Sequence, residues 1–463
     1  MRCLKITLAS LSLLLFLTQC TNPPTTPEDP LTGKELFVEW GKDQIVPFDF
    51  EQQSSLDSLV EAMAEDIDDA RVVMLSEGFH NCEEMLALQY ELVSYLVEHK
   101  GFNIVATESG LPESKYVNDY IHGGDTIPNF WQKSLDILYS EWKQGRVLIN
   151  WLSEYNQSHT NQVDYYGADI GGGYQDWEFP FQQVFTYLDT VDVSTAKKLE
   201  KELDFYFNIM KPYAAYYYVT RLSREQKNDL AFLLDDLIQT FTDKEKLYIE
   251  RSNRKDYVWV LQCIKSMRMA EHYYRNYTHV NDTTHNKVAL YLGANGREIA
   301  MAQNIKWMLQ EKEDAKMIII NHVIHTKTAS QHQGDFYQHF TPMGQLLKQK
   351  LGEELFIIGM TYGSGYYWKL WQMPESRSVD TIPPTAVDGL EQTFASIAPQ
   401  DYYIRLDEAP LLTYNWLHEN TSIRENDYSL AIKPSEWNAC FYLHEVTPAV
   451  AADTVKTTIT TDS

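Results

Sequence analysis

Six short apolar segments most constrain the fold of this chain. They are rich in Val, Ile and Tyr, and their apolar residues run nearly continuously instead of alternating with polar ones. Helix-like stretches separate them. Such runs are typical of strands that are buried on both faces of a largely parallel sheet. The predicted strands are 70–75, 102–107, 163–168, 287–292, 316–321 and 355–360, with 439–444 as a candidate last strand.

The segments between these runs predict helices. After the first strand, Met85, Leu88 and Leu92 recur at helical spacing, and Gly101 predicts the end of that helix. Residues 181–280 are rich in Lys, Glu, Leu and Tyr and show no convincing strand, so we interpret them as three or four helices. The predicted fold class is therefore α/β, with a mostly parallel β-sheet flanked by helices and an inserted helical subdomain at about 181–280.

The N-terminus resembles an export signal. Arg2 and Lys5 precede an apolar run of twelve residues, which is shorter than the ~20 residues that a transmembrane helix needs. The run ends in Leu-Thr-Gln-Cys, which resembles a bacterial lipobox and implies cleavage before Cys20 and lipidation of Cys20. An ordinary secretory signal with an incidental cysteine is the alternative.

The sequence divides into four predicted parts. Residues 1–19 are the lipoprotein signal peptide, and residues 20–35, rich in Pro and Thr, are a flexible tether. Residues 36–450 form one α/β domain that includes the helical insertion, and residues 451–463 are a disordered tail. We therefore expect an exported protein of the bacterial cell envelope, attached to a membrane through an N-terminal lipid.

Charge and cysteine content exclude several classes of protein. The formal net charge of −26 argues against binding to nucleic acid and against electrostatic adhesion to anionic lipid. Three cysteines remain besides Cys3 and Cys20. This odd, small number predicts no dense disulfide framework and at least one free, buried thiol.

Polar side chains follow each of the six predicted strands. Ligands of open α/β sheets bind outside the carboxyl ends of the strands, so we expect these side chains to form one polar cleft. Each residue alone has an equally good structural interpretation, such as an ion pair between Glu108 and Arg297, but the set as a whole favours a function. In strand order the candidates are Glu77 with His80, Glu108, Asp169, Arg297, His322 with His325, and Tyr362.

Several catalytic motifs are absent from the sequence. There is no G-x-S-x-G elbow, no H-E-x-x-H, no P-loop lysine motif and no G-x-G-x-x-G after a strand. Cys82 lies close to His80, but no cysteine-protease signature surrounds it. The remaining acids, bases and cation suit hydrolysis by an activated water or a metal site built from Glu and His.

Four motifs contain most of these polar residues. They read Leu75-Ser76-Glu77-Gly78-Phe79-His80-Asn81-Cys82-Glu83, Ala106-Thr107-Glu108, Arg297-Glu298-Ile299-Ala300-Met301-Ala302-Gln303-Asn304 and His322-Val323-Ile324-His325. In their order and at comparable spacing, these motifs resemble those of the erythromycin esterase family, and the resemblance runs from about Arg71 to Pro448. In this chain Ser76 and Asn81 stand where the family usually has Gly, Glu298 replaces Asp, and Val323 replaces Asn.

This resemblance implies a metal-independent, cofactor-free hydrolase that cleaves a carboxylic ester or lactone with a histidine-activated water. In characterised members the substrate is a macrolide lactone. The resemblance implies that His80 is the general base, with Glu77, Glu108, Arg297, His322 and His325 around it. A carboxylate-oriented histidine can take a proton from water, and an arginine can stabilise the oxyanion or hold the substrate. Either later histidine is a candidate donor to the leaving alkoxide, and the predicted substrate-binding residues are Glu83, Asp169 and Tyr362.

Two alternatives stay open at this point. A metal-dependent hydrolase would use the Glu and His residues as ligands of a divalent ion. A binding lipoprotein would keep the fold without catalysis, although the presence of every acid–base residue counts against it. The candidate metal ligands are Glu77, His80, Glu108 and His322.

Overall fold

The structure is a computed structural model of the chain. It describes residues 32–172, 177–276, 287–328, 339–369, 378–385, 389–419, 423–425, 428–430 and 436–452. The predicted signal peptide, Cys20 and most of the predicted tether lie outside the described residues, as do residues 453–463 of the predicted tail.

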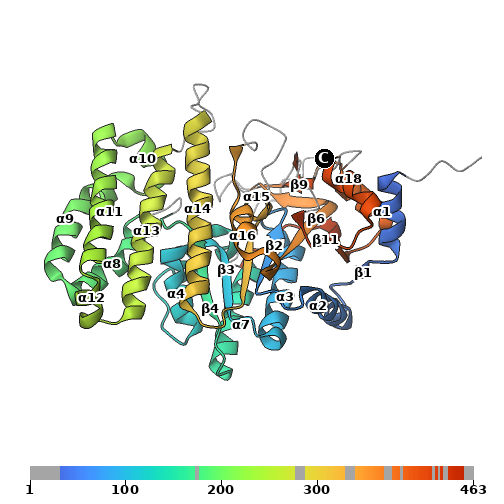
Figure 1. The fold of residues 1–463 in the computed structure, drawn as a ribbon, viewed down its shortest axis with the longest axis horizontal. Coiled ribbons are helices and arrows are strands. Elements are labelled where there is room, and N and C mark those ends of the chain that lie inside the picture. Colours follow the sequence, from blue (N-terminus) through green and yellow to red (C-terminus); the bar gives the residue numbers. More distant parts are fainter. Residues whose placement is uncertain are drawn as a thin grey trace, which may run out of the picture.

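A nine-stranded sheet forms the centre of the molecule (Figure 1). Its order is β1-β8-β11-β6-β2-β5-β3-β4, and β7 pairs with β6 outside this path. The six neighbouring strands from β11 to β4 are all parallel, which confirms the predicted mostly parallel sheet. The strands are β1 (Val46–Pro47), β2 (Val72–Glu77), β3 (Ile104–Gly110), β4 (Asp164–Asp169), β5 (Met317–His322), β6 (Leu355–Trp368), β7 (Val379–Thr381), β8 (Tyr402–Arg405) and β11 (Ala439–Val446).

Helices cover both faces of this sheet, which explains why its strands are apolar at successive positions. Val73 and Leu75 of β2 face one core, and Val72 and Met74 face the other. The first core contains side chains of α2 (Gln53–Ile67), α3 (Glu83–Lys100), α4 (Leu111–Ile121) and α7 (Lys143–Ser158). The second contains side chains of α1 (Gly33–Lys42), α14 (Lys287–Glu311), α16 (Met343–Leu351), α17 (Leu390–Ile397) and α18 (Leu411–Glu419).

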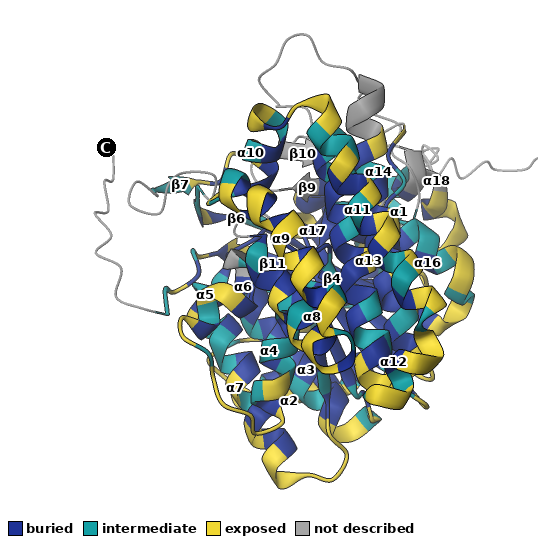
Figure 2. Cartoon of the chain, turned by 90° about the vertical axis from the view of Figure 1, so that its left-hand side faces the viewer, coloured by how far each residue is buried: buried dark blue, intermediate teal, exposed yellow. Residues whose placement is uncertain are grey.

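The inserted subdomain is helical, as predicted, but its described residues, up to Asn276, form six helices instead of three or four. Its helices share a separate core, and Figure 2 shows buried and exposed faces along them. They lie at one end of the long axis of the molecule (Figure 1). The helices are α8 (Glu178–Val191), α9 (Val193–Met210), α10 (Ala214–Arg221), α11 (Arg224–Asp243), α12 (Glu245–Arg251) and α13 (Arg254–Asn276).

The prediction of a strand at 287–292 was wrong. These residues begin α14, a helix of 25 residues. The periodicity of a short apolar run does not distinguish a buried strand from a buried helix. The assignment therefore depends on the length of the whole segment and on the residues that follow the run. Here the helix continues through Gly293 and Gly296 to Glu311, and its second half, from Arg297 on, is rich in good helix formers such as Ala, Met, Gln and Glu. Arg297 therefore projects from a helix, and it does not follow a strand.

Two further features bear on the sequence predictions. All three cysteines among the described residues, Cys82, Cys263 and Cys440, are free and buried. Within the described part of the chain, no helix has the length and hydropathy required to cross a membrane.

Candidate active site

A buried pair of acid and histidine lies at the end of β2. The register of the sheet places Glu77, the last residue of β2, opposite His322 of β5. His80 Nδ1 lies 2.7 Å from Glu77 Oε1, and Gln89 Nε2 of α3 donates to Glu77 Oε2 at 2.7 Å. Both carboxylate oxygens of Glu77 are thus occupied, which fixes the orientation of the His80 ring.

The surroundings of His80 favour its protonated form. Burial alone lowers the pKa of His80, but the hydrogen bond to Glu77 and the negative charges of Glu77, Glu108 and Asp136 outweigh it and raise the pKa above the usual histidine value. His80 therefore binds a proton readily. This is the property required of a group that accepts a proton from water.

The ring of His322 lies next to that of His80, tilted relative to it, and its surroundings favour the neutral form. The two ring centroids are 4.5 Å apart. Burial, followed by the positive charge of His80, holds the pKa of His322 well below its usual value. The backbone N–H of Ile324 donates to His322 Nδ1 at 3.4 Å, so the neutral ring carries its hydrogen on Nε2.

Arg297 joins Asp169 of β4 to Glu108 of β3. Its Nε lies 3.0 Å from both Asp169 oxygens, and its Nη2 donates to Asp169 Oδ2 at 2.5 Å and to Glu108 Oε1 at 2.9 Å. The three side chains are 19%, 14% and 7% exposed, in the order Arg297, Asp169, Glu108. This largely buried, bidentate arrangement is the geometry in which arginine binds carboxylates most strongly.

His325 is a buried cation between two acids. Its Nδ1 lies 2.6 Å from Glu298 Oε1, and its Nε2 lies 3.2 Å from Glu108 Oε1. Burial lowers the pKa of His325, but the charges of Glu298 and Glu108 outweigh it and raise the pKa to about 10. Glu298 also accepts from the Met343 backbone N–H at 2.8 Å, which fixes the pair at the start of α16.

Glu108 connects the two halves of the site. Its Oε1 contacts Arg297 and His325, as described above, and its Oε2 accepts a hydrogen bond from the backbone N–H of His322 at 3.2 Å. Burial raises its pKa, but His325, Arg297 and His80 outweigh burial and hold the pKa of Glu108 well below its usual value. The structure thus brings together all six residues predicted to be catalytic: Glu77, His80, Glu108, Arg297, His322 and His325.

The three residues predicted to bind substrate have other partners in the structure. Asp169 holds Arg297, as described above. Glu83 accepts from Gln144 Nε2 at 3.1 Å and from the Val450 backbone N–H at 2.8 Å. Tyr362 is fully buried in the core, with its ring centroid 5.5 Å from that of Phe79. These contacts favour structural roles for all three.

The segment 447–452, here named the C-terminal strap, holds the loop that carries His80. Glu83 N–H donates to the Thr447 carbonyl at 3.0 Å, and Ala449 N–H donates to the Asn81 carbonyl at 2.9 Å. Asn81 has a φ of +61°, a conformation that Gly adopts freely and Asn tolerates. The position that follows His80 is therefore constrained both by its own backbone and by the strap.

Three polar residues near the site were not predicted from the sequence. Asp136 contributes negative charge at His80 and donates its N–H to Ser109 Oγ at 3.1 Å. Tyr139 lies near Glu77 and Glu108, and burial holds its pKa well above the usual value. Burial also raises the pKa of Glu113 to about 7. None of the three ends a strand in a recognisable motif, so no pattern in the sequence indicated them.

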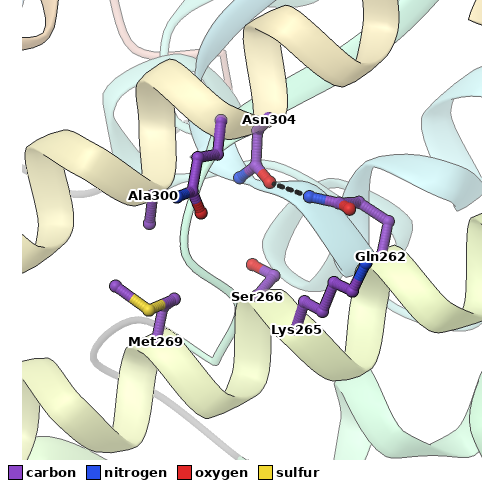
Figure 3. Close-up of a pocket in the computed structure, with 7 residues that line it drawn as sticks. Gln262, Lys265, Ser266, Met269, Ala300 and Asn304 are labelled. Atoms are coloured by element: carbon purple, nitrogen blue, oxygen red, sulfur yellow. Dashed lines mark hydrogen bonds between the residues drawn. The ribbon is translucent and has the colours of Figure 1, made fainter. Parts of the chain in front are cut away.

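A small pocket between α13 and α14 lies beside the end of β4 (Figure 3). Asn304 donates to the Ala168 carbonyl at 2.9 Å and accepts from Gln262 Nε2 at 2.8 Å, the bond dashed in Figure 3. These bonds hold the end of β4 against α14, the helix that carries Arg297. The pocket is lined by Gln262, Lys265, Ser266, Met269, Ala300, Gln303 and Asn304.

The arrangement of possible metal ligands bears on the metal-dependent alternative. Among them, no group of three or more His, Cys, Asp or Glu side chains is arranged to hold a metal ion. The four candidate ligands instead hydrogen-bond to neighbouring protein groups, as shown by the bond between Glu77 and His80.

Replacement of Glu77 by glutamine should move the pH profile. A general base acts in its neutral form, so if His80 has the role predicted from the sequence, activity should fall as the pH drops through the pKa of His80. Glu77→Gln removes the carboxylate whose hydrogen bond and negative charge contribute most to raising the pKa of His80. Burial, which lowers this pKa, then prevails, so the acid limb of the kcat/KM profile should shift to lower pH. The control is Glu98→Gln, which changes an exposed acid beside the exposed His99. An unmoved limb, or a shift to higher pH, would show that His80 is not the titrating base.

The fold and the site together define an α/β protein with a buried acid–histidine pair and an arginine-centred ion-pair network at the carboxyl ends of a parallel sheet. The family model described as erythromycin esterase matches residues 97–447. The chain therefore belongs to the erythromycin esterase family. Membership implies an ester or lactone hydrolase that acts on a small molecule.

Individual relatives agree with this assignment. Erythromycin esterase type II of Escherichia coli is 26% identical over 367 residues, which are 77% of this chain and 83% of that protein. A crystal structure of a Bacillus cereus protein has a TM-score of 0.74 at 18% identity and covers 92% of this chain and 100% of its own. A histidine-to-asparagine mutant of the erythromycin esterase EreC, in its open conformation, has a TM-score of 0.69 at 18% identity, with coverages of 85% and 95%. At these identities the two structures show a shared fold.

Proposed function

We propose that this protein hydrolyses a carboxylic ester or lactone by attack of a water molecule that His80 activates. The observation that carries the proposal is the buried hydrogen bond between Glu77 and His80, 2.7 Å long. Because Nδ1 is held by Glu77, Nε2 is the ring nitrogen that accepts the proton. The family assignment supports ester chemistry, and the site supplies a base with an orienting acid.

The proposed reaction moves one proton in a closed cycle. The water oxygen bonds to the carbonyl carbon while its proton passes to His80 Nε2, and the imidazolium is stabilised by Glu77 and the nearby carboxylates. When the carbon–oxygen ester bond breaks, His80 returns the proton to the leaving alkoxide. The neutral His322 beside His80 is the proposed hydrogen-bond donor to the oxyanion, since its Nε2 carries hydrogen.

Arg297 and His325 have a supporting role in this proposal. Two hydrogen-bond contacts of Arg297 Nε and two of its Nη2 are directed to carboxylates, and His325 is held as a cation by two acids. A histidine with a pKa of about 10 is a weak acid at neutral pH. We therefore assign the two residues to positioning Glu108 and Asp169, not to proton transfer.

A panel of esters and lactones hydrolysed in heavy-oxygen water tests the proposal. In a single turnover with enzyme in excess, the heavy oxygen should appear in the product carboxylate. Serine-hydrolase probes should not label the protein, and Cys82→Ala should stay active because burial holds the pKa of Cys82 well above its usual value, which keeps the thiol protonated.

Other outcomes would identify the rival mechanisms. Transfer of heavy oxygen into a Glu or Asp side chain, or a trapped acyl-enzyme, would overturn attack by water. Loss of activity with a chelator and recovery with one divalent metal would favour the metal-dependent alternative. No turnover of any substrate, with saturable binding of one of them, would favour the binding lipoprotein.

We also propose that the protein is exported and anchored to a membrane of the cell envelope by a lipid on Cys20. The basic start, the apolar run of twelve residues and the cysteine at its end support this proposal. Mass spectrometry of the N-terminal peptide tests it, since a lipid attached to Cys20 is expected.

A further inference from the structure

Two adjacent leucines and a tyrosine on α18 are unusually exposed. Leu411 is 84% exposed, Leu412 76% and Tyr414 52%. We name these three residues the α18 patch. The first turn is fixed by Thr413, whose N–H and hydroxyl both bond to the Pro410 carbonyl, at 2.8 Å and 2.7 Å. The leucines are therefore presented to solvent by an ordered turn, and exposed apolar groups of this kind mark interaction surfaces.

The α18 patch lies beside the point where the N-terminal tether enters the domain. Gly33, the first residue of α1, packs against α18 so closely that a Cβ there would lie 3.3 Å from the Leu412 carbonyl oxygen and 3.0 Å from Trp416 Cβ. Phe37 of α1 also contacts Trp416, with ring centroids 5.3 Å apart. The tether, which would start at Cys20, is therefore connected to the domain next to Leu412.

The length of the tether keeps this end of the domain near the membrane. Eleven residues lie between Cys20 and Thr32, the first described residue. Because a fully extended chain spans at most ~3.3–3.6 Å per residue, α1 and α18 lie within roughly 40 Å of the lipid anchor. Such a short tether gives the patch a high local concentration at the bilayer.

The charge of the chain determines what kind of contact can hold the domain there. A formal net charge of −26 opposes electrostatic adhesion to anionic lipid. Apolar side chains that enter the interfacial region are the remaining source of attraction, and leucine and tyrosine suit that region.

We propose that the α18 patch rests in the outer part of the bilayer to which Cys20 is anchored, so that the membrane is its binding partner. This inference rests on the lipid anchoring proposed above. In Figure 1, α1 and α18 lie at one end of the long axis and α9 and α11 lie at the other. The contact therefore directs the helical insertion away from the membrane.

Spin labels on the anchored, full-length protein test this arrangement. Leu411→Cys and Leu412→Cys place a label in the patch, and Phe232→Cys, at a residue 71% exposed on α11, is the control. The cysteines of the described domain are buried, so an introduced surface cysteine is labelled selectively. The labelled lipoprotein is reconstituted into phosphatidylcholine vesicles. The relaxation of each spin label by oxygen, which concentrates in lipid, is compared with its relaxation by a nickel chelate, which stays in water.

The expected result is a several-fold higher ratio of oxygen to nickel relaxation at Leu411 and Leu412 than at Phe232. If all three sites are equally accessible to nickel while the protein floats with the vesicles, the membrane contact is wrong and the anchor is right. If the patch is protected from both reagents, a second copy of the chain or another protein covers it, which also overturns the proposal. If the parent protein carries no lipid on Cys20 and does not float, both the anchor and the contact are wrong.

Discussion

The variant His80→Ala should lose turnover by about 10²–10⁴-fold in kcat/KM, because removal of a positioned general base has effects of this size. The loss should persist across the pH range, since no other group replaces the base. His80 is buried against Glu77, so the variant also leaves a buried carboxylate with one partner fewer. A cost of about 1–3 kcal/mol in the free energy of unfolding is expected from that change.

The control for this variant is a second pair of Glu and His at the surface. His99 lies 3.8 Å from Glu98 and is 55% exposed. His99→Ala should keep full turnover and stability. Circular dichroism and urea unfolding show whether His80→Ala is folded at the assay temperature. A folded His80→Ala enzyme with parental kcat/KM would remove His80 from the mechanism.

The largest expected effect on stability comes from Arg297→Met. This change leaves Glu108 and Asp169 as buried carboxylates without their shared cation, and breaking a buried ion pair on one side costs about 3–5 kcal/mol. Urea unfolding at neutral pH measures the loss. The difference from the parent should narrow at lower pH, because the charge of Arg297 helps to hold the pKa of Glu108 below its usual value, and this contribution is lost when Glu108 is protonated.

Two further variants separate this effect from a general loss of charge. Arg254→Met breaks a pair with Glu311 in which the arginine is 66% exposed, and it should change the free energy of unfolding by less than ~1 kcal/mol. Adding Asp169→Leu to Arg297→Met should recover part of the stability, since one of the unpaired acids is then gone. Equal losses in Arg254→Met and Arg297→Met would contradict the view of Arg297 as a buried connector.

The sequence predicted the sheet well because its strands are buried on both faces. A strand such as β2 is apolar at successive positions for that reason, and the pattern survives without knowledge of its neighbours. The same rule failed at 287–292, where a continuous apolar run starts a long helix. Hydrophobicity alone does not distinguish these two cases, whereas the 25-residue continuous length of α14 does.

Most of the site was predictable because its residues follow strands, whereas Arg297 was predicted although the segment before it is part of a helix. Glu77, Glu108 and His322 lie at or near the carboxyl ends of β2, β3 and β5. Because ligands of α/β sheets bind outside these strand ends, the sequence pattern was enough to predict them. Their protonation states depend on distant partners, such as Glu298 from α14, which makes His325 a fixed cation. Asp136 and Tyr139 come after β3 and α4, Asp136 directly before the short helix α6 (Ile137–Ser140) and Tyr139 within it, and no spacing in the sequence relates them to His80.

The C-terminal strap also has a consequence for the time at which the site is completed during protein synthesis. The backbone N–H of Val450 donates a hydrogen bond to the side chain of Glu83, which precedes it by 367 residues. The ribosome makes His80 and its acid early, but it must translate almost the whole domain before the segment that secures their loop exists. A nascent or prematurely released chain therefore contains the reactive pair without the contact that holds it, and we expect hydrolytic competence to arise only in the finished chain.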